Sequence, residues 1–332
     1  MVESVLNIEG LKTYFFTEAG VVKAVDGISF NLKKGESLGL VGESGSGKTV
    51  TALSVLRIVP KPGRIIDGKV EYNGEDLLKK TEDEMRRIRG GEIAIIFQDP
   101  SSSLNPVYSI ESQLSDVIRA HQNVSKDETR EKVIEILTMV GLPEAETRIN
   151  EYPHQFSGGM KQRVAIARAL ACEPTLLFAD EPTTNLDVTI QAQVLDLLND
   201  LKKKFGMSLV MITHDMGIIA NMTTRVVVLY AGSVCEIART HDLFAYPRHP
   251  YTEALLAAVP RLDMRKTLRV IPGNIPNLIE PPSGCRFHPR CDYATETCKK
   301  VIPVLEEVGP EHFVACHEWR NIRLKGEMTH SE

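Results

Sequence analysis

Short, almost continuous apolar runs alternate with helical patterns along the chain up to about residue 235. Uninterrupted apolar runs are typical of strands that are buried on both faces of a parallel sheet. Strands alternating with helices predict an α/β layered domain. The predicted strands are Ser37–Val41, Ile93–Phe97, Thr175–Ala179, Ser208–Thr213 and Arg225–Tyr230, and the predicted helices are Lys48–Ile58, Gly158–Ala171 and Val188–Lys204.

The pattern changes twice. Between Asp99 and Gln155 the segments Ser112–His121 and Asp127–Val140 look helical with no strand between them, which indicates an inserted helical subdomain. Beyond Glu236 prolines recur, and long helices cannot form there. We therefore predict a core at residues 1–235, with a helical subdomain at about 99–164, and a small loop-rich C-terminal domain at 236–332.

Composition narrows the function classes. The 332 residues suggest about two domains, and 42 % hydrophobic with 25 % charged residues is ordinary for a globular protein. A net charge of −5 argues against nucleic acid as the main partner, because phosphate backbones demand basic surfaces. No apolar run approaches the roughly 18 residues that span a bilayer, and Met1–Ser4 does not resemble a signal peptide. We expect a cytoplasmic protein whose membrane role goes through a partner.

A glycine-rich loop follows the first predicted parallel strand, with the spacing G-x-x-x-x-G-K-T of a phosphate-binding loop. Its glycines let the backbone curl so that amide N–H groups point at phosphate oxygens, and the next helix directs its positive end at the same anion. We expect Lys48 to reach the β- and γ-phosphates and the Thr49 hydroxyl to bind Mg²⁺. The predicted nucleotide-binding residues here are Gly42, Glu43, Ser44, Gly45, Ser46, Gly47, Lys48, Thr49 and Val50.

Polar residues follow three other predicted strands. Asp180 and Glu181 end one of them, so Asp180 is expected to bind Mg²⁺ together with Thr49. Glu181 is the predicted general base that polarises the attacking water. Gln98, whose amide can touch both the metal shell and the water, and His214, expected near the γ-phosphate, complete the predicted catalytic set.

A second predicted helix terminus for binding an anion begins at Ser157. This residue is a natural N-cap, and Gly158 and Gly159 leave the following amides bare. One γ-phosphate does not need two such cradles from one subunit. Two chains placed head to tail, each completing the nucleotide site of the other, would use both.

These motifs, in order between residues 42 and 214, resemble those of the ATP-binding-cassette (ABC) ATPases. Gly42–Thr49 resembles the Walker A motif and Thr175–Asp180 the Walker B motif, while Gln98 matches the Q-loop and His214 the switch histidine. The resemblance implies an α/β fold, namely a P-loop NTPase core with a β-subdomain and a helical insertion. It also implies an enzyme that hydrolyses ATP with Mg²⁺.

The signature motif of that family, Leu-Ser-Gly-Gly-Gln, is matched by Phe156–Met160, which differs at the first and last positions. Because Ser157, Gly158 and Gly159 are intact, we do not infer a dead site. Thr184–Asp187 resembles the D-loop, with Asn185 where alanine or glycine is common, and it adds Asp187 to the nucleotide-binding residues.

The resemblance also implies an aromatic side chain that stacks on adenine before the phosphate loop. The segment Tyr14-Phe15-Phe16 offers three candidates. Spacing favours Phe15 and then Tyr14, with a core position as the alternative for each. An N-K-x-D element, which guanine-specific NTPases need, does not occur in the sequence.

Two segments of the tail, His249–Leu256 and Gly284–Cys291, resemble the C-terminal region of dipeptide and oligopeptide importer ATPases. That resemblance extends over nearly the whole chain and implies import of peptides. It also implies two related ATPases, two membrane-spanning permease subunits and an extracytoplasmic solute-binding protein. Nickel importers share much of the pattern, so nickel or another small solute is an alternative cargo.

The last region holds a group of cysteines, which in a reducing compartment suggests metal rather than disulfides. Their gaps of five, six and seventeen residues are wider than those of zinc knuckles and favour a four-iron four-sulfur (4Fe–4S) cluster. Zinc, with His288 and His312 as further ligands, and no metal at all are the alternatives. The predicted ligands are Cys285, Cys291, Cys298 and Cys316, whereas Cys172 and Cys235 are expected to be free thiols.

Two other function classes agree less well with the sequence. A soluble ABC ATPase that acts on DNA or ribosomes is disfavoured by the single cassette, the absence of a heptad insertion and the acidic balance. A phosphate-loop kinase of small molecules would leave the segment around Ser157 unexplained. The sequence therefore favours an ATPase subunit at the cytoplasmic face of the cell membrane that powers peptide import.

Overall fold

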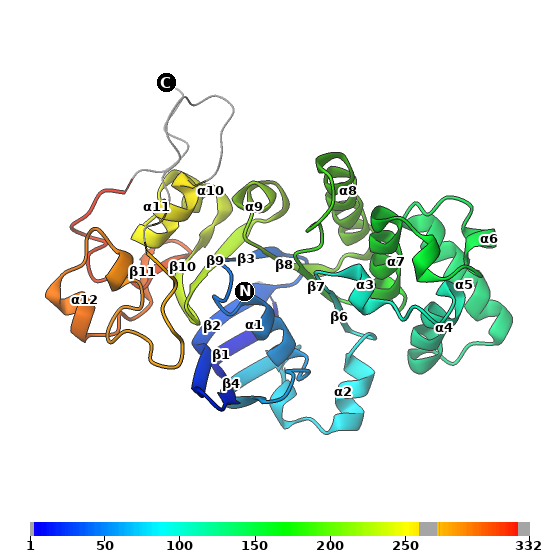
Figure 1. The fold of residues 1–332 in the computed structure, drawn as a ribbon, viewed down its shortest axis with the longest axis horizontal. Helices are drawn as coiled ribbons and strands as arrows, with labels where there is room; N and C mark the ends of the chain where they lie inside the picture. The colour runs from blue at the N-terminus through cyan, green and yellow to red at the C-terminus, as the bar shows by residue number, and fades with distance from the viewer. Residues whose placement is uncertain (1–2, 259–270, 272, 325–332) are drawn as a thin grey trace. The chain divides into compact units, whose positions relative to one another are not determined.

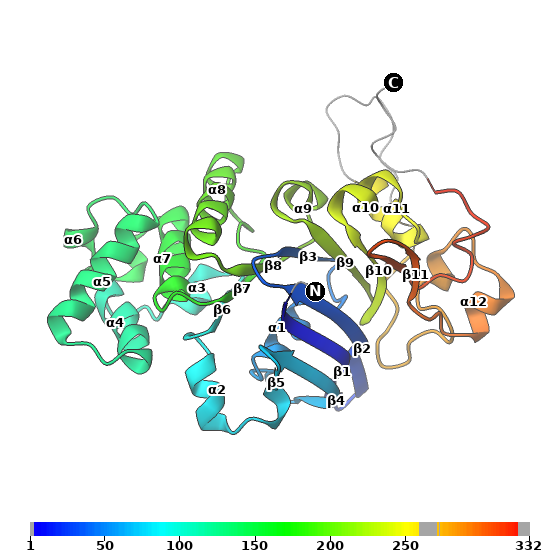
Figure 2. The same cartoon turned by 180° about the vertical axis from the view of Figure 1, so that it is seen from behind.

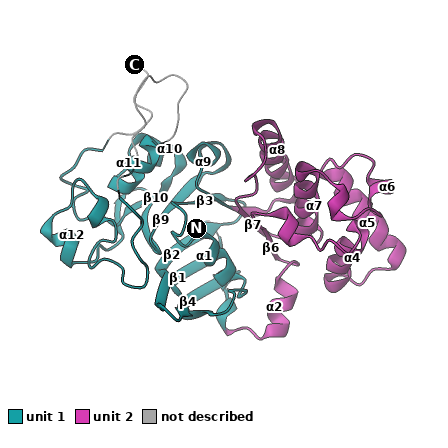
Figure 3. Cartoon of the chain, viewed as in Figure 1, with its two compact units in different colours: residues 1–78, 211–332 teal, residues 79–210 magenta. Residues whose placement is uncertain are grey.

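The computed structural model describes residues 3–258, 271 and 273–324 of the chain (Figure 1). Two compact units are present (Figure 3): unit 1 is formed by residues 1–78 and 211–332, and unit 2 by residues 79–210. Unit 1 is thus assembled from both ends of the chain. Parts of the predicted C-terminal domain, residues 259–270, 272 and 325–332, lie outside the described residues.

An antiparallel sheet forms the N-terminal part of unit 1 (Figures 1 and 2), with strand order β2-β1-β4-β5. Leu6 on the central strand pairs with Leu32 on one side and with Tyr72 on the other, and all three side chains are buried. The sheet corresponds to the expected β-subdomain. Its strands are β1 (Ser4–Thr17), β2 (Gly20–Lys33), β4 (Gly63–Tyr72) and β5 (Glu75–Asp76), followed by η1 (Leu77–Lys79).

A second set of strands in unit 1 has the order β11-β12-β10-β9-β3. β3 (Ser37–Val41) and β9 (Arg225–Tyr230) pair in parallel and are buried along their whole length, as their continuous apolar sequences predict. The pairs beyond β9 are antiparallel. These outer strands are β10 (Ser233–Arg239), β11 (Glu306–Gly309) and β12 (His312–Val314).

Short helices accompany these strands. None of those in the described tail exceeds the 8 residues of α11, in keeping with the proline content of the region. The helices of unit 1 are α1 (Lys48–Val55), α9 (Met216–Met222), α10 (Thr240–Ala245), α11 (Pro250–Ala257), η3 (His288–Arg290) and α12 (Glu296–Lys300).

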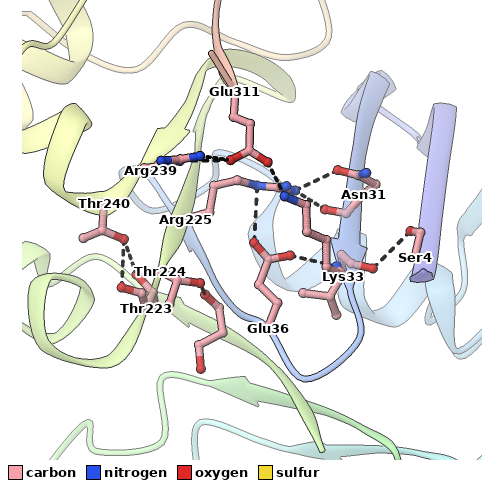
Figure 4. Close-up of polar contacts among 12 residues, drawn as sticks. Ser4, Asn31, Lys33, Glu36, Thr223, Thr224, Arg225, Arg239, Thr240 and Glu311 are labelled. Atoms are coloured by element: carbon pink, nitrogen blue, oxygen red, sulfur yellow. Dashed lines mark hydrogen bonds and ion pairs between the residues drawn. The ribbon is translucent and has the colours of Figure 1, made fainter. Parts of the chain in front are cut away.

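Charged and hydroxyl side chains tie the tail hairpin to the first strands of unit 1 (Figure 4). Glu311, in the turn between β11 and β12, pairs with Lys33 of β2 and with Arg239, at 2.8 Å from the latter. Arg225 of β9 pairs with Glu36 at 3.5 Å and bonds to Asn31. Residues from the start, middle and end of the chain therefore stabilise one another within unit 1.

Unit 2 contains a parallel strand pair, β6 (Ile93–Ile96) and β7 (Leu176–Asp180), and the helical insertion. The strand β8 (Ser208–Thr213) begins in unit 2 and ends in unit 1. The helices are α2 (Glu82–Ile88), α3 (Pro100–Ser103), α4 (Ile110–His121), α5 (Lys126–Met139), α6 (Ala145–Arg148), η2 (Pro153–Gln155), α7 (Gly158–Leu170) and α8 (Val188–Phe205).

The predicted strands and helices are confirmed, with small differences at their ends. α4 begins two residues before the predicted start because Ser109 caps it, accepting a hydrogen bond from Ser112 N at 3.3 Å. α1 ends at Val55 rather than Ile58, since Arg57 has a φ of 53° that no helix continues through. Within the part of the chain that the structure describes, no helix is long and apolar enough to cross a bilayer.

Candidate functional site

The phosphate loop, residues 42–49, connects β3 to α1 in unit 1. Gly42 has a φ of 153°, and a β-carbon there would lie 2.1 Å from the Leu229 carbonyl oxygen. Gly47 has a φ of 103°, and its β-carbon would lie 2.5 Å from the Ala24 carbonyl oxygen. Gly45 also has a positive φ, but nothing lies within 4 Å of its β-carbon position. Close packing therefore requires glycine at positions 42 and 47, whereas a β-carbon at position 45 would meet no neighbour.

Lys48 folds back over this loop. Its Nζ donates to the carbonyl oxygens of Gly42 at 2.7 Å and Glu43 at 3.0 Å. Thr49, the predicted Mg²⁺ ligand, is exposed, whereas Ser46 is buried. The ammonium group of Lys48 thus lies against the backbone of the phosphate loop, as phosphate binding requires.

Two of the aromatic candidates for adenine stacking differ in their contacts. The hydroxyl of Tyr14 donates to Asp26 Oδ1 at 2.5 Å; burial, with this hydrogen bond, raises the pKa of Tyr14 to about 12. Asp26 also pairs with Arg286 of the tail. Phe15 lies against Gly63, where a β-carbon would meet its ring at 2.7 Å. Tyr14 is therefore fixed by its hydroxyl and Phe15 by packing.

The carboxylates predicted for catalysis lie in unit 2. Asp180 is the last residue of β7 and is buried. Glu181 follows with a φ of 45°, and its Oε2 accepts from Gln98 Nε2 at 2.8 Å and from Thr184 Oγ1 at 3.1 Å. The structure therefore brings Gln98 and Glu181 together, as the sequence predicts from their strand-end positions.

The signature segment also lies in unit 2. Ser157 caps α7 by accepting from Met160 N at 3.4 Å, and Gly158 has nothing within 4 Å of its β-carbon position. Asp187 caps α8 in the same way, accepting from Ile190 N at 3.0 Å. A β-carbon on Gly159 would lie 3.0 Å from the Ile190 side chain, so the two helix termini are neighbours within unit 2.

The remaining site residues are divided between the units. His214 directly follows β8 in unit 1, with an exposed side chain, and Val50 lies in the first turn of α1. Of the predicted Mg²⁺ ligands, Thr49 belongs to unit 1 and Asp180 and Gln98 to unit 2.

The four tail cysteines line one pocket together with His249, His288 and His317. Burial raises the pKa of the Cys291 thiol to about 11 and that of Cys316 to about 12. Across residues 3–258, 271 and 273–324, however, no group of three or more His, Cys, Asp or Glu side chains is arranged to hold a metal ion. The expected metal centre is therefore not supported by the arrangement of the described side chains.

Sequence reasoning missed two tail residues that contact the phosphate loop. The Tyr251 hydroxyl accepts from Glu43 N at 2.8 Å, and Arg290 forms two hydrogen bonds with the Glu43 carboxylate. Tyr251 lies in the segment His249–Leu256 and Arg290 in Gly284–Cys291, the two segments that resemble importer ATPases. Nothing in their spacing indicates a partner in the loop, because the contacts span more than 200 positions of sequence.

Comparison with known proteins supports this picture. The ABC transporter family matches residues 25–184, and the family described as oligopeptide/dipeptide transporter, C-terminal region, matches residues 235–298. The dipeptide transport ATP-binding protein DppD of Escherichia coli (strain K12) is 46 % identical over 315 residues, covering 95 % of this chain and 96 % of that protein. The probable peptide ABC transporter ATP-binding protein y4tR of Sinorhizobium fredii is 49 % identical over 319 residues, covering 95 % of each.

A solved structure is also similar. The ATP-binding cassette MJ0796, in a dimeric post-hydrolysis state bound to ADP and Pi, has a TM-score of 0.64 and 27 % identity, and covers 71 % of this chain and 98 % of that one. The matched portion corresponds to a complete cassette, and the part of this chain beyond it is additional.

Proposed function

Because this chain belongs to the ATP-binding proteins of peptide ABC transporters, we propose that it hydrolyses ATP to drive the uptake of di- or oligopeptides. The observation that carries the proposal is identity of 46 % with a dipeptide transport protein over 95 % of this chain. Both the cassette and the tail are included in that alignment, and the tail is where the oligopeptide/dipeptide family matches.

The unit 1 residues supply the phosphate cradle. Amide groups of the loop and the N-terminus of α1 bind the phosphates, Lys48 neutralises charge on the β- and γ-phosphates, and Thr49 binds Mg²⁺. His214 interacts with the γ-phosphate. Tyr14 or Phe15 stacks on the adenine. Phosphoryl transfer to water needs mainly positioning and charge stabilisation, which these groups provide.

The unit 2 residues supply the attacking water and the metal shell. Glu181 is the general base, and its hydrogen bond to Gln98 at 2.8 Å supports a shared water site for the two side chains. Asp180 completes the Mg²⁺ ligands with Thr49 and Gln98. Gln98 lies two residues after the end of β6, at the start of the helical insertion, so it is placed to transmit the state of the nucleotide to a membrane partner.

Ser157, Gly158, Gly159 and Asp187 act on the nucleotide of a second subunit. The uncrowded N-terminus of α7, with nothing near the β-carbon position of Gly158, supports a docking place for an anion. We therefore propose a head-to-tail pair of related ATPases on the cytoplasmic face of the membrane. Two membrane-spanning permease subunits and an extracytoplasmic solute-binding protein complete the transporter.

The tail cysteines are proposed to hold a 4Fe–4S cluster. A zinc ion needs thiolates about 3.8 Å apart, from Zn–S bonds of about 2.3 Å in a tetrahedron. Among the described residues no group of three or more His, Cys, Asp or Glu side chains is arranged to hold a metal ion, although the four thiols line one pocket. The proposal rests on that shared pocket, since a cluster of this kind is held by four cysteine thiolates. When bound it would supply cross-links between the loops that carry the four cysteines.

Purification of the chain with its partners from membranes tests the function. We expect two permease subunits and a second ATPase to co-purify, and peptides to stimulate ATP hydrolysis when the solute-binding protein is added. Stimulation by nickel instead of peptides would show that the cargo is nickel. Recovery of the chain with ribosomes or DNA, and with no membrane protein, would overturn the proposal.

A further inference from the structure

The Glu43 side chain is held by Arg290 of the tail. Arg290 Nη1 donates to Glu43 Oε2 at 2.7 Å, and Nη2 donates to Oε1 at 3.1 Å. This is the bidentate geometry in which an arginine fixes both the position and the orientation of a carboxylate. The second residue of the phosphate loop is therefore oriented from outside the loop.

The arginine end of this contact is enclosed, whereas the Glu43 side chain is 25 % exposed. The Arg290 side chain is only 5 % exposed, and its guanidinium also donates to the Tyr230 hydroxyl at 3.2 Å. Tyr230 packs against Tyr251 and Phe287, with ring centroids 4.6 and 5.1 Å away. Exposed ion pairs contribute little to stability, whereas removal of one partner from an enclosed pair is destabilising. We therefore expect the loss of Arg290 to disturb the structure around Glu43.

The backbone of Glu43 is held as well, and it links Glu43 to the phosphate-binding Lys48. Glu43 N donates to the buried Tyr251 hydroxyl at 2.8 Å, while the Glu43 carbonyl oxygen accepts from Lys48 Nζ at 3.0 Å. A shift of Glu43 would therefore move one of the two carbonyl groups to which Lys48 bonds. Arg290 thus reaches the phosphate-binding lysine through a single intermediate residue.

Arg290 is also next to the thiol pocket. It is the last residue of η3, which follows Cys285, and Cys291 comes directly after it. Phe287 and His288 of the same turn line the pocket. The turn that carries Arg290 therefore lines the pocket of the cysteines and also contacts the phosphate loop.

We propose that Arg290 is a positioning residue for ATP binding: by fixing Glu43 it holds the phosphate loop and Lys48 in the conformation that receives the β- and γ-phosphates. The inference rests on the proposed function, and it adds a tail residue to the nucleotide site. It assigns the C-terminal domain a part in nucleotide affinity within its own chain.

The test is a double-mutant cycle on the intact transporter complex, using Arg290→Met, Glu43→Gln and the two combined. The dissociation constant for a fluorescent ATP analogue with Mg²⁺, the KM and kcat of ATP hydrolysis and the melting temperature are measured for each. Arg290→Lys keeps the positive charge but cannot form the two parallel hydrogen bonds of the guanidinium group. Arg320→Met, which removes the partner of Glu306 in an exposed tail ion pair at 3.2 Å, is the matched control.

We expect each single variant to raise the dissociation constant and KM about tenfold with kcat little changed, since loss of one bidentate pair weakens binding in ground and transition states alike. The double variant should lose no more affinity for ATP than the single variant with the weaker binding. Arg290→Lys should recover part of the affinity, and Arg320→Met should match the unmodified protein.

Unchanged affinity in folded Arg290 and Glu43 variants, or losses that simply add, would refute the positioning role. Where Arg290→Met does not fold, the comparison of Arg290→Lys with Glu43→Gln decides by the same criterion. An unmodified complex that fails to hydrolyse ATP would refute the proposed function instead, so the two failures are distinguishable.

Discussion

Gln98 Nε2 lies 2.8 Å from Glu181 Oε2, so the amide that follows β6 donates directly to the carboxylate that follows β7. Because β6 and β7 are parallel neighbours, both side chains leave the same edge of the sheet. Thr184 adds a second hydrogen bond at 3.1 Å. The carboxylate is thereby oriented by two donors, as a general base that must meet one water requires.

Replacing Glu181 with Gln should preserve ATP binding and lower turnover by about 10²–10⁴-fold, the usual contribution of a general base. Head-to-tail dimers should then persist, because hydrolysis no longer opens them. ATP turnover and size-exclusion chromatography with ATP and Mg²⁺ check this. Glu135→Gln, on the exposed face of α5, is the control. Hydrolysis at the unmodified rate in Glu181→Gln would exclude the assignment.

Replacing Gln98 with Glu should shift the acidic limb of the pH–rate profile upward by at least about one unit. Two carboxyl groups at hydrogen-bond distance share a proton, which raises the apparent pKa of the pair. Gln98→Ala removes the donor without adding charge, so its profile should keep the original midpoint at reduced kcat. Identical profiles for Gln98→Glu and the unmodified protein would show that the two side chains separate during turnover.

Alanine at Gly42 should be far more damaging than alanine at Gly45. Gly45→Ala incurs only the cost of a positive φ, about 1–2 kcal/mol, because its β-carbon meets nothing within 4 Å. Gly42→Ala would also bring a methyl group to 2.1 Å from the Leu229 carbonyl oxygen. Thermal melting without nucleotide should rank the variants in that order. Equal melting temperatures would contradict the packing described for Gly42.

Anaerobic purification should yield iron and acid-labile sulfide in roughly equal amounts, about four of each per chain. Replacing Cys298, the most buried of the pocket cysteines, with Ser should remove both and lower the melting temperature. Cys172→Ser is the matched control, since that thiol lies in unit 2. Stoichiometric zinc would overturn the iron–sulfur proposal.

Acid should destabilise the tail through His249. Burial lowers the pKa of its imidazole from 6.5 to about 4, and its Nδ1 accepts the Tyr251 N–H at 3.0 Å as the cap of α11. Between these two values the unfolded chain binds the proton and the folded chain does not, so stability falls as pH falls. The loss from this group should reach about 2 kcal/mol at pH 5.

The measurement is the melting temperature from pH 7.5 to pH 5 for the unmodified protein and for His249→Asn, which can still cap the helix. Glu236, the buried acid that accepts from His249 N at 2.9 Å, is present in both proteins. The variant should have the flatter profile. Parallel profiles would show that His249 is not the group responsible.

The sequence predicts those parts of the fold and site in which local pattern and three-dimensional position coincide. β3, β8 and β9 match their predicted bounds because each is a continuous apolar run between turns. The pairing of Gln98 with Glu181 follows from the geometry of parallel strands, which places residues after their carboxyl ends at one edge. Ser157 caps α7, as its residue type predicts.

What the sequence does not reveal is set by contacts between distant segments. The antiparallel strands β1, β2 and β4 carry interruptions of register, such as the shifts between Ile8 and Leu11, that blur their alternation. The bond between Arg290 and Glu43 has no local signal at all. Charge complementarity between two such residues becomes informative only once the fold has brought them together.

The order of synthesis gives the construction of unit 1 from both chain ends a further meaning. Arg290 leaves the ribosome 247 residues after Glu43. In a nascent chain, or in one truncated before residue 290, the phosphate loop therefore lacks its contact with Arg290. We therefore expect ATP to bind more weakly to unfinished copies than to the chain that contains Arg290.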